Sequence, residues 1–200
     1  MDKKLKEVTD YVTLGMDSYK EKISTTQNYI SQPHVELVFF IDLKNNKFYW
    51  TGKSYPTPSQ QSGLVRISDL RTHFFELDDV GKVMILGCHD LTIFNPRSDA
   101  VASGWRKNVK EEFKLISKKK NPTIVLQHPL TTDCVNVWTA AWNNLTTTIS
   151  SIEKYASAGR WPHITYHSNK KGKPHCTLEN VLQKTKRGDT IDFIVRMDQR

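Results

Sequence analysis

The strongest constraint on the fold is a strand–helix–strand pattern between residues 82 and 126. Residues 82–86 (KVMIL) and 123–126 (TIVL) are short apolar runs typical of buried strands. Between them, residues 104–119 predict an amphipathic helix that Asn121-Pro122 ends. Its apolar stripe consists of Trp105, Val109, Phe113 and Ile116. A strand, helix and strand in this order usually form a right-handed crossover between parallel strands, so we predict an α/β fold.

The rest of the chain predicts further elements around this unit. We predict a single α/β domain over residues 1–200, with a mixed, mainly parallel sheet flanked by helices, an N-terminal helix and a β-hairpin. The N-terminal helix spans residues 2–30, so that residues 1–32 could form an appendage. The hairpin spans residues 34–51. Other predicted elements are helices at 68–77, within 134–157 and from Thr177 to Lys184, and a last strand at 190–195.

Composition excludes several classes of protein. Twenty-nine Lys and Arg against 21 Asp and Glu give a formal charge of +8, and 38% of the residues are hydrophobic, which is too many for a disordered chain. No apolar run approaches the length of a membrane span, and no signal peptide is recognisable. The three cysteines are Cys88, Cys134 and Cys176. They form no metal-binding or disulfide pattern, so we expect reduced thiols and a cytoplasmic location.

Polar clusters follow both apolar strands. Residues 87–90 (GCHD) come after the first strand, and residues 127–129 (QHP) after the second. In open α/β sheets, ligands bind beyond the carboxyl ends of the strands. We therefore predict that His89, Asp90 and His128 converge on one site and act as catalytic residues. Imidazole and carboxylate can hold a divalent metal that activates water, or form a pair for proton transfer.

Other residues could bind the substrate near this site. Arg97 could clamp a phosphate or carboxylate, and Thr131, Thr132 and Asp133 follow the second cluster. Each candidate also has a structural interpretation. His89 could bond to a backbone carbonyl, Asp90 could cap a turn, His128 could be a satisfied half-buried histidine, Arg97 could be a surface residue, and Asp133 could be a helix N-cap.

The two clusters resemble part of a known family. Gly87-Cys88-His89-Asp90 resembles the Gly-Asn-His-Asp/Glu block of calcineurin-like metallophosphoesterases, and Gln127-His128-Pro129 resembles the histidine block that follows it. The resemblance implies metal-assisted hydrolysis of phosphoesters. It covers only residues 87 to 129, and the chain lacks the family's opening Asp-x-His block and its Gly-Asp-x-x-Asp block. We therefore assign no membership.

Three functions follow from these observations. The first is a metal-assisted hydrolase that acts on a phosphorylated or otherwise anionic substrate, with His89, Asp90 and His128 as metal ligands. The second is a regulatory module that binds a nucleotide or anion without turnover. The third is a basic nucleic-acid-binding protein that uses hairpin aromatics, unless these pack in the core. The residues of this third surface are Tyr49, Trp50, Tyr55, Lys47 and Lys53. The spacing of His163 and His167 does not by itself support a zinc site, and the oligomeric state is left open.

Overall fold

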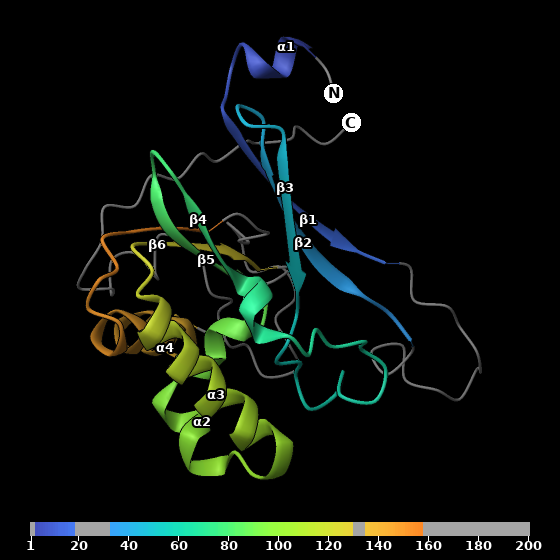
Figure 1. Cartoon of the computed structure of the whole chain (residues 1–200). Coiled ribbons are helices and arrows are strands. Elements are labelled where there is room, and N and C mark those ends of the chain that lie inside the picture. The colour runs from blue at the N-terminus through green and yellow to red at the C-terminus, as the bar shows by residue number, and fades with distance from the viewer. Residues whose placement is uncertain (1–2, 19–32, 130–134, 158–200) are drawn as a thin grey trace.

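Two β-sheets and a group of helices are stacked in three layers (Figure 1). The computed structural model describes residues 3–18, 33–129 and 135–157. Thr131, Thr132, Asp133, His163, His167 and the elements predicted beyond residue 157 lie outside these ranges.

The first layer is an antiparallel sheet with the order β1-β2-β3. Its strands are β1 (Tyr11–Asp17), β2 (Glu36–Asp42) and β3 (Lys47–Gly52), and a short helix α1 (Lys3–Lys6) precedes them. Asn46, with a φ of 53°, occupies the left-handed region in the turn between β2 and β3, a conformation that asparagine tolerates better than most residues. The predicted hairpin is therefore confirmed.

The second layer is a mixed sheet with the order β4-β5-β6-β7. It consists of β4 (Phe74–Leu77), β5 (Gly81–Gly87), β6 (Ile124–His128) and β7 (Lys154–Ser157). Strand β4 pairs antiparallel to β5, whereas β5, β6 and β7 are parallel. The predicted crossover from β5 to β6 is confirmed, with Gly87 opposite His128 in the register.

The third layer consists of helices. It contains α3 (Gly104–Lys120), which confirms the predicted helix, and α4 (Val135–Thr148). Asn121 ends α3 in a left-handed C-cap, and Lys118, Lys119 and Lys120 occupy its last turn, where the helix dipole favours cations. Shorter elements complete the chain, namely η2 (Leu70–His73), η3 (Asp90–Phe94) and α2 (Pro96–Val101). None of the helices in the described ranges has the length and apolarity needed to cross a membrane.

The four-stranded sheet is buried on both faces. One face packs on the helices around the buried ring of Phe113. The other face packs on the three-stranded sheet through Val38, Phe40, Leu77, Val83 and Ile85. Burial on both sides explains why β5 is a continuous apolar run rather than an alternating one.

Three sequence predictions are wrong in detail. The N-terminal helix is only four residues long, and residues 11–17 form a strand instead. The predicted helix at 68–77 is the 3₁₀ turn η2 followed by strand β4. The helical prediction for 134–157 holds for α4 but not for β7. A mainly parallel sheet is not confirmed, because β4 and the whole three-stranded sheet pair antiparallel.

Candidate functional site

A pocket of about 240 Å³ lies at the carboxyl ends of β5 and β6, against β1 and β2. Its described lining consists of Gly15, Met16, Asp17, Glu36, Leu37, Val38, Gly87, Cys88, His128 and Pro129. A liquid water occupies about 30 Å³, so the pocket has room for about eight waters or one small substrate group. Its position is the one at which α/β sheets usually bind ligands.

Among the described residues, His128 is the histidine that lines this pocket. It ends β6 and shares with Ile124 and Leu126 the face that packs toward the three-stranded sheet. Gly15 of β1 lies opposite, and a Cβ at that position would be 3.5 Å from Nδ1 of His128. Burial lowers the pKa of His128 to about 4 because the charged imidazolium loses its hydration. The imidazole is therefore neutral at pH 7.

His89 faces a different environment. Its Nδ1 donates a hydrogen bond to the carbonyl oxygen of Tyr55 (2.8 Å), and its ring stacks on the Tyr55 ring at a centroid distance of 5.7 Å. Burial, followed by the nearby charges of Lys53 and Arg106, lowers the pKa of His89. His89 does not belong to the described lining of the pocket. The sequence analysis gave a hydrogen bond to a backbone carbonyl as the structural alternative for His89, and this is the bond observed.

Asp90 is fully buried and accepts three backbone hydrogen bonds. Its Oδ1 accepts from the amides of Ser54 (3.0 Å) and Tyr55 (2.7 Å), and its Oδ2 accepts from the amide of Gly87 (3.0 Å). Both carboxylate oxygens therefore join the end of β5 to the segment after β3. Asp90 positions the backbone beside the pocket and does not belong to its described lining.

Glu36, which lines the pocket, belongs to a buried ion pair that the sequence analysis did not identify. Lys53 Nζ pairs with Glu36 Oε2 and also donates to Gln60 Oε1 (3.1 Å). Gln60 Nε2 in turn donates to Glu36 Oε1 (2.8 Å). The side chains of Lys53 and Glu36 are only 2% and 10% exposed. The available signal was Glu36 directly before the apolar run at residues 37–41, because a buried charge needs a partner.

The remaining candidates lie elsewhere. Arg97 is exposed on α2, near the helix start that Asn95 caps, and it does not line the pocket. Two of the hairpin aromatics proposed for nucleic-acid binding pack inside: Tyr49 stacks on Phe75 at 4.4 Å, and Tyr55 is 2% exposed. With Lys53 also buried, the predicted stacking surface does not form, and the core interpretation is confirmed for Tyr49 and Tyr55.

The described lining of the pocket combines one neutral imidazole with two carboxylates, Asp17 and Glu36, and a half-buried cysteine, Cys88. Within residues 3–18, 33–129 and 135–157, no group of three or more His, Cys, Asp or Glu side chains is arranged to hold a metal ion. No Lys or Arg belongs to the described lining. The described residues therefore supply a metal-type ligand in His128 but no complete ligand set.

Comparison with known proteins assigns neither a family nor a function to this pocket. The chain matches no known family model, and no curated protein is similar enough in sequence to count as a relative.

Proposed function

We propose that this protein hydrolyses a small phosphorylated or otherwise anionic substrate with the help of a divalent metal, in the pocket at the carboxyl ends of β5 and β6. The observation that carries the proposal is the neutral, half-buried imidazole of His128 at the end of a parallel strand, in a pocket that also contains carboxylates.

The lowered pKa of His128 favours one of two roles. A general base works best when its pKa is near the working pH. A pKa of about 4 is too low for an efficient base at pH 7. The same low pKa leaves the nitrogen lone pairs unprotonated, and a metal ligand must be unprotonated. His128 is therefore better suited to hold a metal than to accept a proton from water.

The charges around the pocket also favour a metal. Asp17 and Glu36 are acidic, and the positive charge of Lys53 is already paired with Glu36. An anionic substrate would meet repulsion from Asp17 unless a cation lay between them. A divalent ion would provide that attraction, polarise the scissile bond and lower the pKa of a bound water.

The test uses the full-length protein and two measurements. Metal content is determined by elemental analysis after purification without chelators. Hydrolysis of p-nitrophenyl phosphate and bis(p-nitrophenyl) phosphate is followed with added Mg²⁺, Mn²⁺ or Zn²⁺. We expect a stoichiometric metal, and we expect His128→Ala to lose it together with about 100-fold or more in rate. Lys107→Ala, an exposed change on α3, is the matched control. Equal metal content and rate in His128→Ala would refute the proposal.

A second candidate is a module that binds an anion without turnover. It is favoured by the lack of a complete ligand set among the described residues. This candidate predicts that a small anion, with inorganic phosphate as the probe, raises the melting temperature of metal-free protein. It also predicts that neither phosphate ester is hydrolysed under any metal condition.

A further inference from the structure

Two arginines from separate parts of the chain meet at one tryptophan, outside the pocket. The guanidinium carbon of Arg66 lies 4.0 Å from the centroid of the Trp105 ring, and that of Arg106 lies 5.2 Å from the same centroid. Arg66 belongs to the segment between β3 and η2, whereas Trp105 and Arg106 belong to the first turn of α3. Folding therefore brings together two positive charges that are far apart in the sequence.

Both guanidiniums are held in place by the fold. The amides of the two residues that flank Arg66 donate to carbonyl oxygens of other segments, at 2.9 and 3.2 Å. Arg106 donates from Nη1 to the carbonyl oxygen of Pro56 at 2.8 Å. Its guanidinium carbon also lies 4.1 Å from the centroid of the buried Tyr55 ring. Contacts between a guanidinium and an aromatic ring restrict the side chain without neutralising its charge.

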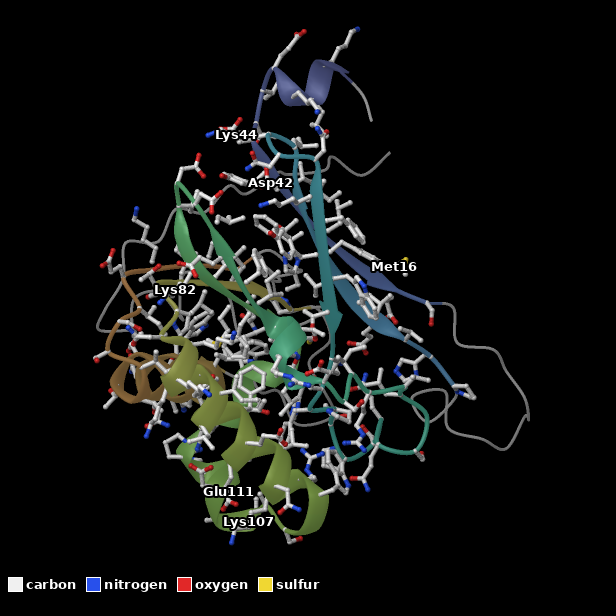
Figure 2. The ribbon with its side chains drawn as sticks, in the orientation of Figure 1. Met16, Asp42, Lys44, Lys82, Lys107 and Glu111 are labelled. Atoms are coloured by element: carbon white, nitrogen blue, oxygen red, sulfur yellow. The ribbon has the colours of Figure 1, made fainter. Side chains whose placement is uncertain are left out.

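The two guanidiniums have no carboxylate partner among the described residues. The ion pairs within residues 3–18, 33–129 and 135–157 use other basic side chains. Lys107, the next basic residue on α3, pairs with Glu111 at 3.7 Å, and the two lie next to each other on the outward side of the helix (Figure 2). The first turn of α3 contains no acidic residue, although the helix dipole favours one there. The surface at Trp105 therefore carries positive charge that the described residues do not compensate.

The chemistry of the two guanidiniums selects the ligand. Each guanidinium carries five N–H donors in a planar fork, and Arg106 uses one of its donors on Pro56. The fork matches two oxygens of a carboxylate or a phosphate. A carboxylate has two oxygens and a single charge, so one guanidinium satisfies it. A phosphate monoester has three terminal oxygens and a charge of about −1.5 to −2 at pH 7, so it can bridge both guanidiniums.

We propose that Arg66 and Arg106 form a binding site for a phosphate monoester, with Trp105 as the platform that positions the two guanidiniums. The three residues do not belong to the described lining of the pocket, and the inference does not depend on the function proposed there. A phosphate monoester is present both on a phosphorylated serine of a partner protein and on a small phosphorylated molecule. The site binds the group that these two sources share.

The first test is calorimetric titration of the full-length protein with phenyl phosphate, in a buffer that contains a chelator so that no metal contributes. We expect saturable binding that weakens as the concentration of sodium chloride is raised. Arg66→Gln and Arg106→Gln should each weaken the binding about tenfold or more. Arg71→Gln is the matched control, because it removes the same charge from an exposed arginine that already pairs with Asp69. The control should bind as the unmodified protein does.

Two results of this titration would overturn the inference. The first is the absence of saturable binding in the unmodified protein. The second is an equal affinity in Arg66→Gln and Arg71→Gln. Arg66 is exposed, so Arg66→Gln should fold and decides the question even if Arg106→Gln does not fold. A purely structural stacking of Arg66 on Trp105 would lower the melting temperature of Arg66→Gln and leave the affinity for phenyl phosphate unchanged.

A second titration distinguishes the two sources of the phosphate group. It uses a pentapeptide with a central phosphoserine between alanines. Binding of this peptide at least about tenfold tighter than phenyl phosphate supports the site as one for a phosphorylated protein. Equal or weaker binding supports it as one for a small phosphorylated molecule. Binding of the unphosphorylated peptide with the same affinity as the phosphorylated one would overturn the inference.

Discussion

Replacing His128 with glutamine should make the protein less sensitive to acid. The pKa of His128 is about 4 in the folded chain, against an ordinary value of 6.5. Between these two values the unfolded chain binds a proton at this position and the folded chain does not. Lowering the pH from 6.5 toward 4 therefore favours the unfolded chain. Glutamine does not titrate, so His128→Gln removes this contribution.

The size of the effect follows from the two pKa values. Proton linkage at one site with pKa values of 6.5 and about 4 reduces the free energy of unfolding by about 2 kcal/mol between pH 7.5 and pH 5.0. For a urea m-value of about 2 kcal/mol/M, the midpoint of unfolding shifts by about 1 M. The folded pKas of His73 and His89 are also lowered by burial. The variant should therefore keep part of the acid sensitivity.

The assay is urea unfolding followed by tryptophan fluorescence at pH 7.5 and pH 5.0. A chelator is present, so that metal binding does not contribute to the stability. The quantity compared is the change in unfolding free energy between the two pH values, which cancels any effect of the substitution that does not depend on pH. Lys107→Gln, an exposed change on α3, should behave as the wild type. An equal loss in His128→Gln and wild type would refute the burial of this imidazole against Gly15.

Two further predictions concern the buried polar groups beside the pocket, and both are measured by urea unfolding at pH 7.5. Lys53→Met should lower the unfolding free energy by about 3–5 kcal/mol because it leaves Glu36 buried without its cation, and adding Glu36→Leu should restore much of the loss. No recovery in the double variant would contradict this. Asp90→Asn should cost about 2–4 kcal/mol, because an amide nitrogen cannot accept the backbone hydrogen bonds. The exposed Asp78→Asn should stay within about 0.5 kcal/mol, and equal losses in the two variants would contradict the role of Asp90.

The crossover from β5 to β6 could be predicted because each of its parts carries an unambiguous local signal. Strand β5 contains a continuous apolar run at residues 83–86 that ends at Gly87, and α3 has one apolar stripe and a clear stop. Strand β1 was misread because Val8, Val12 and Met16 also recur at four-residue steps. Val12, Leu14 and Met16 alternate at the two-residue period of a strand, and their pairing with β2 decides between the two periods.

The position of the candidate site could be predicted from the sequence, but most of the residues that line it could not. The carboxyl ends of β5 and β6 are adjacent, as predicted, and His128 lines the pocket there. The partners of His89 and Asp90 come from the segment after β3, which the local pattern does not place next to β5. Pairing across such sequence distances depends on tertiary packing, which propensity and periodicity do not encode.

The same tertiary pairings explain how the pocket is held in shape. Residues 53–55 are bound from three directions: Lys53 pairs with Glu36 of β2, the amides of Ser54 and Tyr55 bind Asp90, and Ser54 Oγ bonds to His73 Nε2 at 2.8 Å. Hydrogen bonds to charged groups contribute about 1.5–3 kcal/mol each, so moving this segment would break several strong contacts at once. The amide of Gly87 is fixed by the same Asp90. The wall of the pocket next to Cys88 and Glu36 is therefore rigid before any ligand binds. A preorganised wall reduces the ordering cost of binding, and it would also hold a metal-bound group in a constant position relative to His128.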